Sequence, residues 1–90
     1  MKDYIIINEF DNVAVVLRPF KKGEVVEGVT LLEDIPQAHK VALKEIKKGE
    51  DVIKYGNPIG HATKDIHVGE HVHTHNVQTN HHLRDRKSVV

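Results

Sequence analysis

The hydrophobic positions of this chain come in short, mostly β-branched runs that are separated by Gly, Pro, Asn or Asp. Such runs are typical of β-strands, and the residues between them favour turns. The predicted strands are 12–17, 25–26, 29–32, 40–43 and 51–55, with shorter or less regular ones near 59–63 and at 70–77. Only 36–46 is compatible with a short helical turn, and Val41 weakens that pattern. We therefore expect an all-β fold with at most one helical turn.

One short pattern occurs several times. The pattern consists of an apolar residue, two intervening positions, Gly-Glu and a nearby valine. It is found at 20–25, 46–52 and 66–72. A weaker fourth copy, 35–41, has Ala38 in the glycine position. Glycine permits positive φ, so each copy predicts a tight turn that leads into a strand. The copies are spaced too irregularly for a solenoid, and we interpret the Gly-Glu pairs as structural.

The apolar spacing ends near residue 77, and residues 78–90 are polar and basic. This pattern predicts one domain over residues 1–77 and a polar, flexible C-terminal tail over 78–90. His81 and His82 lie in that tail, so we do not expect them to contribute to a site.

Composition narrows the range of functions. Ninety residues suffice for one small domain, and thirteen basic side chains balance thirteen acidic ones, which argues against a nucleic-acid or anionic membrane partner. The absence of cysteine excludes disulfides, thiolate nucleophiles and cysteine-ligated metals. The apolar run at 5–7 is too short for a signal peptide or a membrane span, which favours a cytoplasmic protein. A core with so few aromatic residues favours association with a partner subunit or a second copy of the chain.

Histidine is the most informative residue type. Six of the eight histidines lie between His67 and His82, and His71, His73 and His75 alternate. Alternate residues of a strand share a face and lie about 6.6 Å apart at about 3.3 Å per residue. Imidazoles bind metals and exchange protons near neutral pH. The spacing therefore predicts that His73 and His75 act as metal ligands or as an acid/base pair, with His71 at the strand edge in second rank.

Six segments carry a resemblance to a known family. They are DNVAV at 11–15, DIP at 34–36, HKVAL at 39–43, IKYG at 53–56, IGHAT at 59–63 and GEHVHTHN at 69–76. In this order they resemble the amino-terminal domain of altronate and galactarate dehydratases, which also stands alone as the small subunit of sulfolactate sulfo-lyase and of split altronate dehydratases. The visible departure is Ala38, where the family usually has glycine, and it affects a turn rather than the chemistry.

The resemblance implies a SAF domain with the β-clip fold. The family's enzymes remove water, or in one branch sulfite, from an acidic polyol or hydroxy acid, usually with a divalent metal such as iron. They carry a large second domain or subunit that these 90 residues lack. The resemblance therefore implies the small subunit of a sugar-acid dehydratase, which would be inactive alone. Its small acidic substrate and its metal, expected to be Fe²⁺, would be held mainly with the large catalytic subunit.

Within that framework the candidate residues divide by role. The expected catalytic side chains are those of His73, His75, His39 and Lys54, and the expected substrate-binding side chains are those of Lys40, Asn76 and Tyr55. His73 and His75 have the alternative role of metal ligands shared with the partner subunit. The competing interpretations are a solvated His39–Lys40 surface pair, a solvated Lys54 and a Tyr55 packed in the core.

Three other functions stay open at this stage. The chain is alternatively the small subunit of sulfolactate sulfo-lyase, a non-catalytic β-clip module for assembly or carbohydrate contact, or a histidine-rich metal buffer. A catalytic subunit predicts activity only after mixing with a large partner. A non-catalytic module predicts that alanine at His73 and His75 leaves function intact.

Overall fold

The computed structural model describes residues 2–79, and this part of the chain contains strands and turns but no helix. Its strands are β1 (Tyr4–Ile5), β2 (Val13–Val16), β3 (Val25–Val26), β4 (Val29–Thr30), β5 (Lys40–Ala42), β6 (Asp51–Lys54), β7 (Asn57–Ala62), β8 (His71–Val72) and β9 (Val77–Thr79). The predicted all-β fold is confirmed, and residues 36–39 form a tight turn rather than a helical one. No helix capable of crossing a membrane occurs in the described residues.

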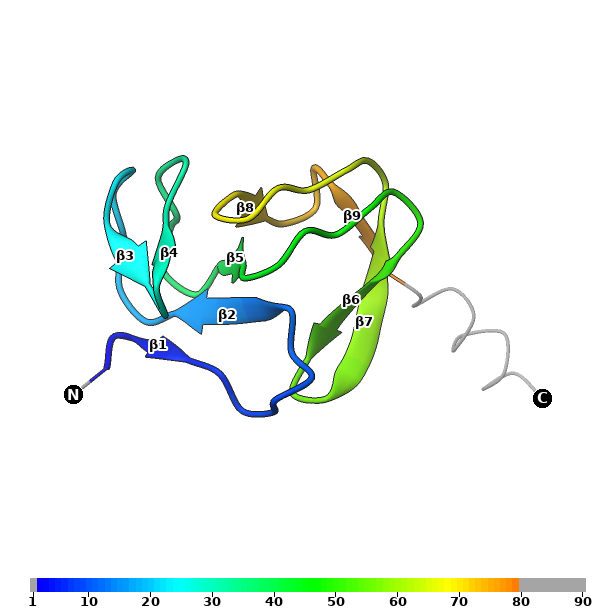
Figure 1. Cartoon of the computed structure of the whole chain (residues 1–90), viewed down its shortest axis with the longest axis horizontal. Coiled ribbons are helices and arrows are strands. Elements are labelled where there is room, and N and C mark those ends of the chain that lie inside the picture. Colours follow the sequence, from blue (N-terminus) through cyan, green and yellow to red (C-terminus); the bar gives the residue numbers. More distant parts are fainter. Residues whose placement is uncertain (1, 80–90) are drawn as a thin grey trace.

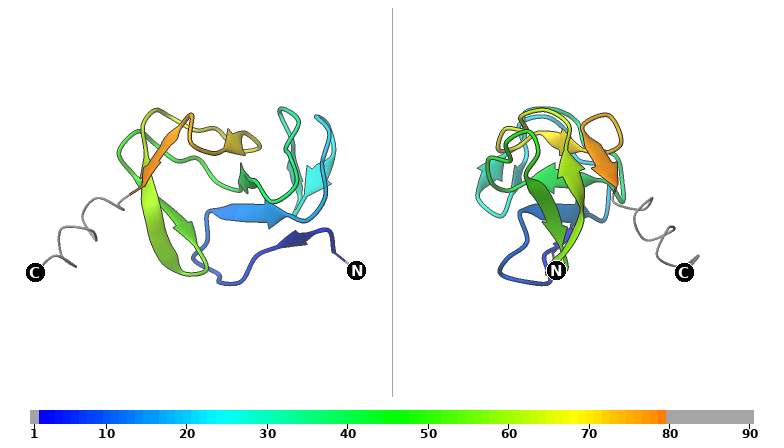
Figure 2. Two further views of the ribbon diagram at one scale, coloured as in Figure 1. Left: turned by 180° about the vertical axis from the view of Figure 1, so that it is seen from behind. Right: turned by 90° about the vertical axis from the view of Figure 1, so that its right-hand side faces the viewer.

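The strands form three small antiparallel sheets. The central sheet has the order β1-β2-β5-β8, while β3 pairs with β4 and the order β6-β7-β9 makes the third sheet. The β3–β4 hairpin lies at one end of the molecule and the β6-β7-β9 sheet at the other, with the central strands between them (Figures 1 and 2). The histidine-rich segment lies at one edge of the central sheet, where β8 pairs with β5.

All four copies of the repeated pattern are tight turns. The residue in the glycine position has positive φ in each: 95° at Gly23, 72° at Ala38, 89° at Gly49 and 90° at Gly69. The turns associate in pairs through their buried apolar residues, because Phe20 bridges Ile35 and Ile46 bridges Ile66. The predicted turns are confirmed, including the copy that has alanine.

The glutamates of the Gly-Glu pairs hold the turns closed. In the first copy the carboxylate of Glu24 accepts the backbone N–H of Lys21 at 2.8 Å, and Glu50 and Glu70 accept the corresponding N–H groups in their own copies. In the fourth copy Pro36 has no N–H to donate, and His39 stands in the place of the glutamate. The His39 side chain is therefore not engaged in closing the turn.

Two buried clusters of aliphatic residues form the core. Strands β2 and β5 contribute to both, because neighbouring residues of a strand face opposite sides. Val13 and Ala42 belong to the cluster beside the β6-β7-β9 sheet, whereas Ala14 and Val41 belong to the cluster beside the β3–β4 hairpin. The central sheet thus lies between two halves of the core and ties them together.

The prediction of one strand over 70–77 is wrong beyond Val72. Residues 73–76 form a turn, and pairing resumes only at β9, against β7. Asn76 causes the break: its Oδ1 accepts the N–H of His73 at 3.0 Å, and its Nδ2 donates to the carbonyl of His71 at 2.9 Å. Strand β9 continues to Thr79, two residues past the expected domain boundary, and the rest of the predicted tail lies outside the described residues.

Candidate functional site

Three imidazoles meet at the centre of the molecule. His39, His71 and His73 each present one ring nitrogen, and these nitrogens lie within 4.8 Å of one another. His39 Nδ1 is 2.8 Å from His71 Nε2, and the rings of His39 and His73 are stacked with centroids 3.9 Å apart. Within residues 2–79 these form the one group of three or more side chains arranged to hold a metal ion. We call these three side chains the imidazole cluster.

The fold brings the imidazole cluster together from two distant segments. His39 ends the turn before β5, and β5 pairs with β8 so that Val41 lies opposite His71. The carboxylate of Glu33 accepts the backbone N–H of His71 at 2.9 Å, which fixes the start of β8. The turn built by Asn76 then places His73 over His39.

The membership of the cluster differs from the expected pair of His73 and His75. His71, which the sequence placed in second rank, replaces His75. His75 is exposed, and its ring is tilted relative to that of His71 with centroids 5.1 Å apart. The reason is local: the chain leaves the strand after Val72, so the two-residue alternation no longer places His73 and His75 on one face.

Burial and positive neighbours lower the pKa of two imidazoles of the cluster, those of His71 and His73. Burial lowers the pKa of His71, and nearby His75 and His39 lower it further, while Glu33 opposes the shift. The pKa of His73 is lowered first by burial and then by His39 and Lys40. His73 Nδ1 is buried without a hydrogen-bond partner. Neutral imidazoles with free lone pairs are the form in which histidine binds metals or accepts protons.

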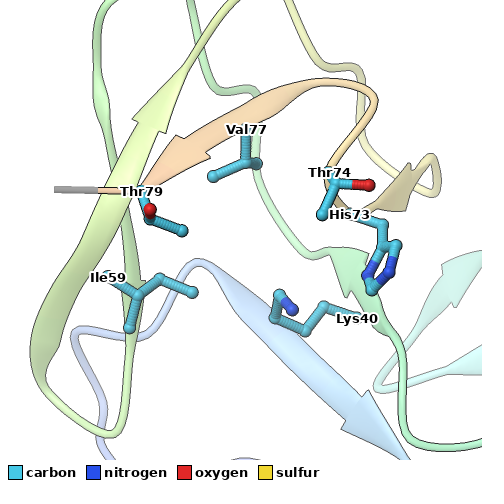
Figure 3. Close-up of a pocket in the computed structure, with 6 residues that line it drawn as sticks. All are labelled: Lys40, Ile59, His73, Thr74, Val77 and Thr79. Atoms are coloured by element: carbon cyan, nitrogen blue, oxygen red, sulfur yellow. The ribbon is translucent and has the colours of Figure 1, made fainter. Parts of the chain in front are cut away.

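A cavity of about 130 Å³ opens beside the cluster. It is lined by Lys40, Ile59, His73, Thr74, Val77 and Thr79. Figure 3 shows the Lys40 amine reaching into this space next to His73, with Ile59 and Thr79 across from them. Burial of Lys40 lowers its pKa, and the positive charge of Lys54 adds to this effect. The cavity therefore has a cationic side adjoining the imidazoles and an aliphatic side between β7 and β9.

The remaining candidate residues lie around this arrangement. Lys54 is close enough to lower the pKa of Lys40, and its Nζ lies 4.9 Å from the centroid of the Tyr55 ring. Tyr55 is 42% exposed in the β6–β7 turn, so the alternative of a Tyr55 packed in the core is wrong. Asn76 is fully buried, and its carboxamide bonds the backbone of the cluster. Asn76 therefore orders the backbone of the cluster from the protein interior and is not exposed on the open side of the site.

Comparison with known proteins identifies the family. Residues 2–80 match the family model described as the altronate/galactarate dehydratase SAF domain. The chain belongs to this family. The β-clip fold that the resemblance implied agrees with the short strands and small sheets of this SAF domain.

Curated relatives show how much of a longer enzyme this SAF domain corresponds to. It is 45% identical over 84 residues to an altronate dehydratase of Bacillus subtilis (strain 168), covering 89% of this chain and 17% of that protein. It is 51% identical over 81 residues to the altronate dehydratase of Escherichia coli (strain K12), covering 86% and 16%. It is also 34% identical over 88 residues to (2R)-sulfolactate sulfo-lyase subunit alpha of Chromohalobacter salexigens, covering 86% and 94%. The chain thus spans about a sixth of the altronate dehydratases that it matches.

Sequence reasoning missed Glu33 and ranked His71 too low among the residues of the candidate site. Glu33 precedes a turn and carries no local motif, and its contact with His71 depends on a fold across 38 residues. His71 was undervalued because the strand was expected to continue. The sequence did carry a signal for His39, because this residue occupies the position of the glutamate in the fourth copy of the repeated turn, which begins with Ile35-Pro36.

Proposed function

We propose that this SAF domain is the small subunit of a sugar-acid dehydratase and forms one wall of an active site that a large partner completes. The observation that carries the proposal is the convergence of His39, His71 and His73 next to the Lys40 cavity. Two features of the relatives support it: the altronate dehydratases are several times longer than the matched region, and a relative of similar length is named as a subunit of a lyase.

Lys40 is assigned to the carboxylate of the substrate. Its amine lies at the cavity, half-buried, with Lys54 nearby. Burial and a like charge both disfavour an ammonium group, and a bound carboxylate relieves both effects. An anionic substrate is therefore the ligand that this side of the cavity favours, in agreement with a hydroxy acid or sugar acid.

The resemblance implies a divalent metal, and the imidazole cluster fits one. The fit rests on three imidazole nitrogens that lie within 4.8 Å of one another and on the unpartnered Nδ1 of His73. His39, His71 and His73 are the residues of this chain that would hold the ion. A bound divalent metal supplies Lewis-acid stabilisation of the negative charge that develops on substrate oxygen when a proton is removed beside a carboxylate.

The other predicted roles fall on residues outside the imidazole cluster. His75 and Tyr55 are exposed, and Lys54 is close enough to lower the pKa of Lys40. Proton transfer by His75 or Lys54 stays a prediction, as does substrate contact by Tyr55. In this proposal His73 acts as a ligand rather than as the acid/base partner of His75, and His39 acts as a ligand rather than in proton transfer.

The proposal is tested by mixing the purified chain with its large partner and following loss of water from altronate or galactarate. We expect activity from the mixture and none from the chain alone. Lys40→Met should lower kcat/KM about a hundredfold, because a charge-assisted hydrogen bond contributes about 1.5–3 kcal/mol. The exposed Lys44 provides the matched control, and Lys44→Met should leave kcat/KM within about twofold of the unsubstituted protein.

Two results would contradict this assignment. A mixture that binds no acidic substrate and eliminates nothing supports the non-catalytic β-clip module instead. Equal effects of Lys40→Met and Lys44→Met would remove Lys40 from the substrate site.

Sulfolactate sulfo-lyase is the second candidate, favoured by one observation. The match to its subunit alpha from Chromohalobacter salexigens covers 94% of that protein, so the two chains correspond almost end to end. The same anion-holding wall would then serve a substrate that loses sulfite. Release of sulfite from (2R)-sulfolactate by the mixed subunits, without dehydration of altronate, would establish this alternative.

A further inference from the structure

We infer that this chain by itself binds one divalent transition-metal ion through His39, His71 and His73. The biological role of that ion rests on the proposed function. The expectation from the family resemblance was a metal held mainly with the large subunit. The inference is that three imidazoles of one small domain, whose nitrogens lie within 4.8 Å of one another, bind the ion without a contribution from a partner.

The distances suit a metal ion after small side-chain rotations. Zinc binds histidine nitrogen at about 2.0–2.1 Å, which separates two ligands of a tetrahedral site by about 3.3 Å. The nitrogens of the cluster lie within 4.8 Å of one another, and the His39–His71 pair is at 2.8 Å. The His39–His71 pair is therefore slightly closer than two ligands of a common ion, and separations of up to 4.8 Å have to close by side-chain rotation.

The hydrogen bonding of the cluster is incomplete without an ion. His39 and His71 bond each other, but His73 Nδ1 is left buried and unpartnered. Buried polar atoms in folded proteins nearly always have a partner, and each exception calls for an explanation. In this inference a cation bound at Nδ1 of His73 would give that atom a partner, and its bonds to His39 and His71 would replace the hydrogen bond between them.

Surrounding groups hold the ligands in place. Glu33 accepts the N–H of His71 and adds a negative charge near the cluster, while Asn76 bonds the backbone on both sides of Val72. Such supporting contacts orient ligands and tune affinity in metal sites. The cluster is thus preorganised by groups that are not themselves ligands.

The donor set determines which ions fit. All three ligands are imidazoles, which suit Zn²⁺, Co²⁺, Ni²⁺ and Fe²⁺, whereas Mg²⁺ and Ca²⁺ require oxygen ligands. Three protein ligands also leave a coordination position open, as in catalytic rather than structural zinc sites. His73 borders the cavity that contains the Lys40 amine, so that open position adjoins the proposed carboxylate site.

The test uses the 90-residue chain carrying His81→Ala and His82→Ala, which removes the two histidines predicted to lie in the tail. Zn²⁺ binding is measured by calorimetry and Co²⁺ binding by visible absorption, with Mg²⁺ as the comparison ion. We expect one Zn²⁺ or Co²⁺ per chain with a Kd on the order of micromolar or tighter, and no Mg²⁺ binding at the same concentrations. Millimolar binding of Zn²⁺ and Co²⁺ would overturn the inference.

Two substitutions separate the cluster from its neighbours. His73→Ala should weaken Zn²⁺ binding more than about a hundredfold, beyond the 10–100-fold typical of supporting residues. The matched control His75→Ala should change it less than about threefold, as should His67→Ala, which removes an exposed histidine that pairs with Glu45. Zn²⁺ binding that survives His73→Ala but is lost in His75→Ala would assign the ion to a site at His75 and overturn the inference.

A second measurement avoids any loss of folding in the variants. In the chain with an intact cluster, paramagnetic Co²⁺ should broaden the imidazole NMR signals of His39, His71 and His73 before those of His61 and His67. Simultaneous broadening of all five would indicate non-specific binding and contradict a built site. Metal binding without activity in the mixed subunits would refute the proposed function alone, whereas activity with no metal binding by the isolated chain would refute this inference alone.

Discussion

The buried carboxylate of Asp11 holds the loop before β2 in place through hydrogen bonds to backbone N–H groups. Asp11 is 4% exposed, and its carboxylate accepts backbone N–H groups of Ile7, Asn8 and Gly56, the last at 2.7 Å. Burial alone raises the pKa of Asp11, but the N–H groups of Gly56, Tyr55, Asn8 and Ile7 together outweigh it and lower the pKa. One carboxylate thereby ties the 7–12 loop to the turn between β6 and β7.

Replacing Asp11 should destabilise the protein in a pH-dependent way. Asp11→Ala should lower the free energy of unfolding by about 2 kcal/mol at pH 7, because the loop N–H groups lose a charged acceptor. The folded pKa lies below the unfolded value of about 3.9, so this contribution is complete above about pH 4 and disappears as pH falls through the folded pKa.

Urea unfolding of both proteins between pH 7 and pH 2, followed by circular dichroism, checks this dependence. The exposed Asp51 is the control, and Asp51→Ala should cost less than about 0.5 kcal/mol. A difference between Asp11→Ala and the unsubstituted protein that persists unchanged at pH 2 would refute the electrostatic explanation.

At the scale of elements, the repeated turns share a backbone but differ in their surroundings. Gly49 and Gly69 have almost the same φ, 89° and 90°. A Cβ added at Gly49 meets nothing within 4 Å, whereas one at Gly69 would lie 2.5 Å from the backbone oxygen of Thr30. Gly69 also accepts the N–H of Leu32, so this turn is packed directly against the segment after β4.

Alanine at these two glycines separates conformational strain from packing. Gly49→Ala should reduce the free energy of unfolding by about 1 kcal/mol, the usual cost of the left-handed conformation for a residue with Cβ. Gly69→Ala should cost about 3 kcal/mol, because the new Cβ also forces the 30–32 segment away. Parallel urea titrations measure both, and equal losses would show that strain alone determines the need for glycine.

The alternation of residue types along the chain predicted some strands correctly and failed at one. Runs of valine and isoleucine between turn residues predicted β2, β5 and β6, because side-chain shape and two-residue alternation act within the strand itself. The same alternation failed after Val72, where the Asn76 side chain competes for the backbone groups of His71 and His73. Asparagine in an alternating run was the visible sign that the strand could end.

Across the whole molecule, the two halves of the core are equivalent in construction. Ile35 and Ile46 are both fully buried and occupy the same position in their turns, but they belong to different clusters. Strands β2 and β5 supply residues to both clusters. Unfolding of one half would therefore expose one face of these two strands to water. The domain should therefore behave as one cooperative unit.

Matched substitutions in the two halves test this coupling. Ile35→Ala and Ile46→Ala should each lower the free energy of unfolding by about 2–5 kcal/mol, as expected for a buried isoleucine. Each variant should still unfold in one transition that coincides for circular dichroism and amide hydrogen exchange. A variant in which amides of one half exchange early while the other half stays protected would indicate independent halves.

The sequence by itself determined the all-β class, the four turns, the family and the concentration of histidines in one segment, because each depends on residue types and short spacings. It also placed His39, Lys40 and His73 among the candidates. Only the tertiary structure decided which imidazoles meet, since the pairing of β5 with β8 and the turn at Asn76 bring His39, His71 and His73 together and leave His75 outside. Contacts across more than 30 residues depend on how the whole chain packs, and no local pattern records them.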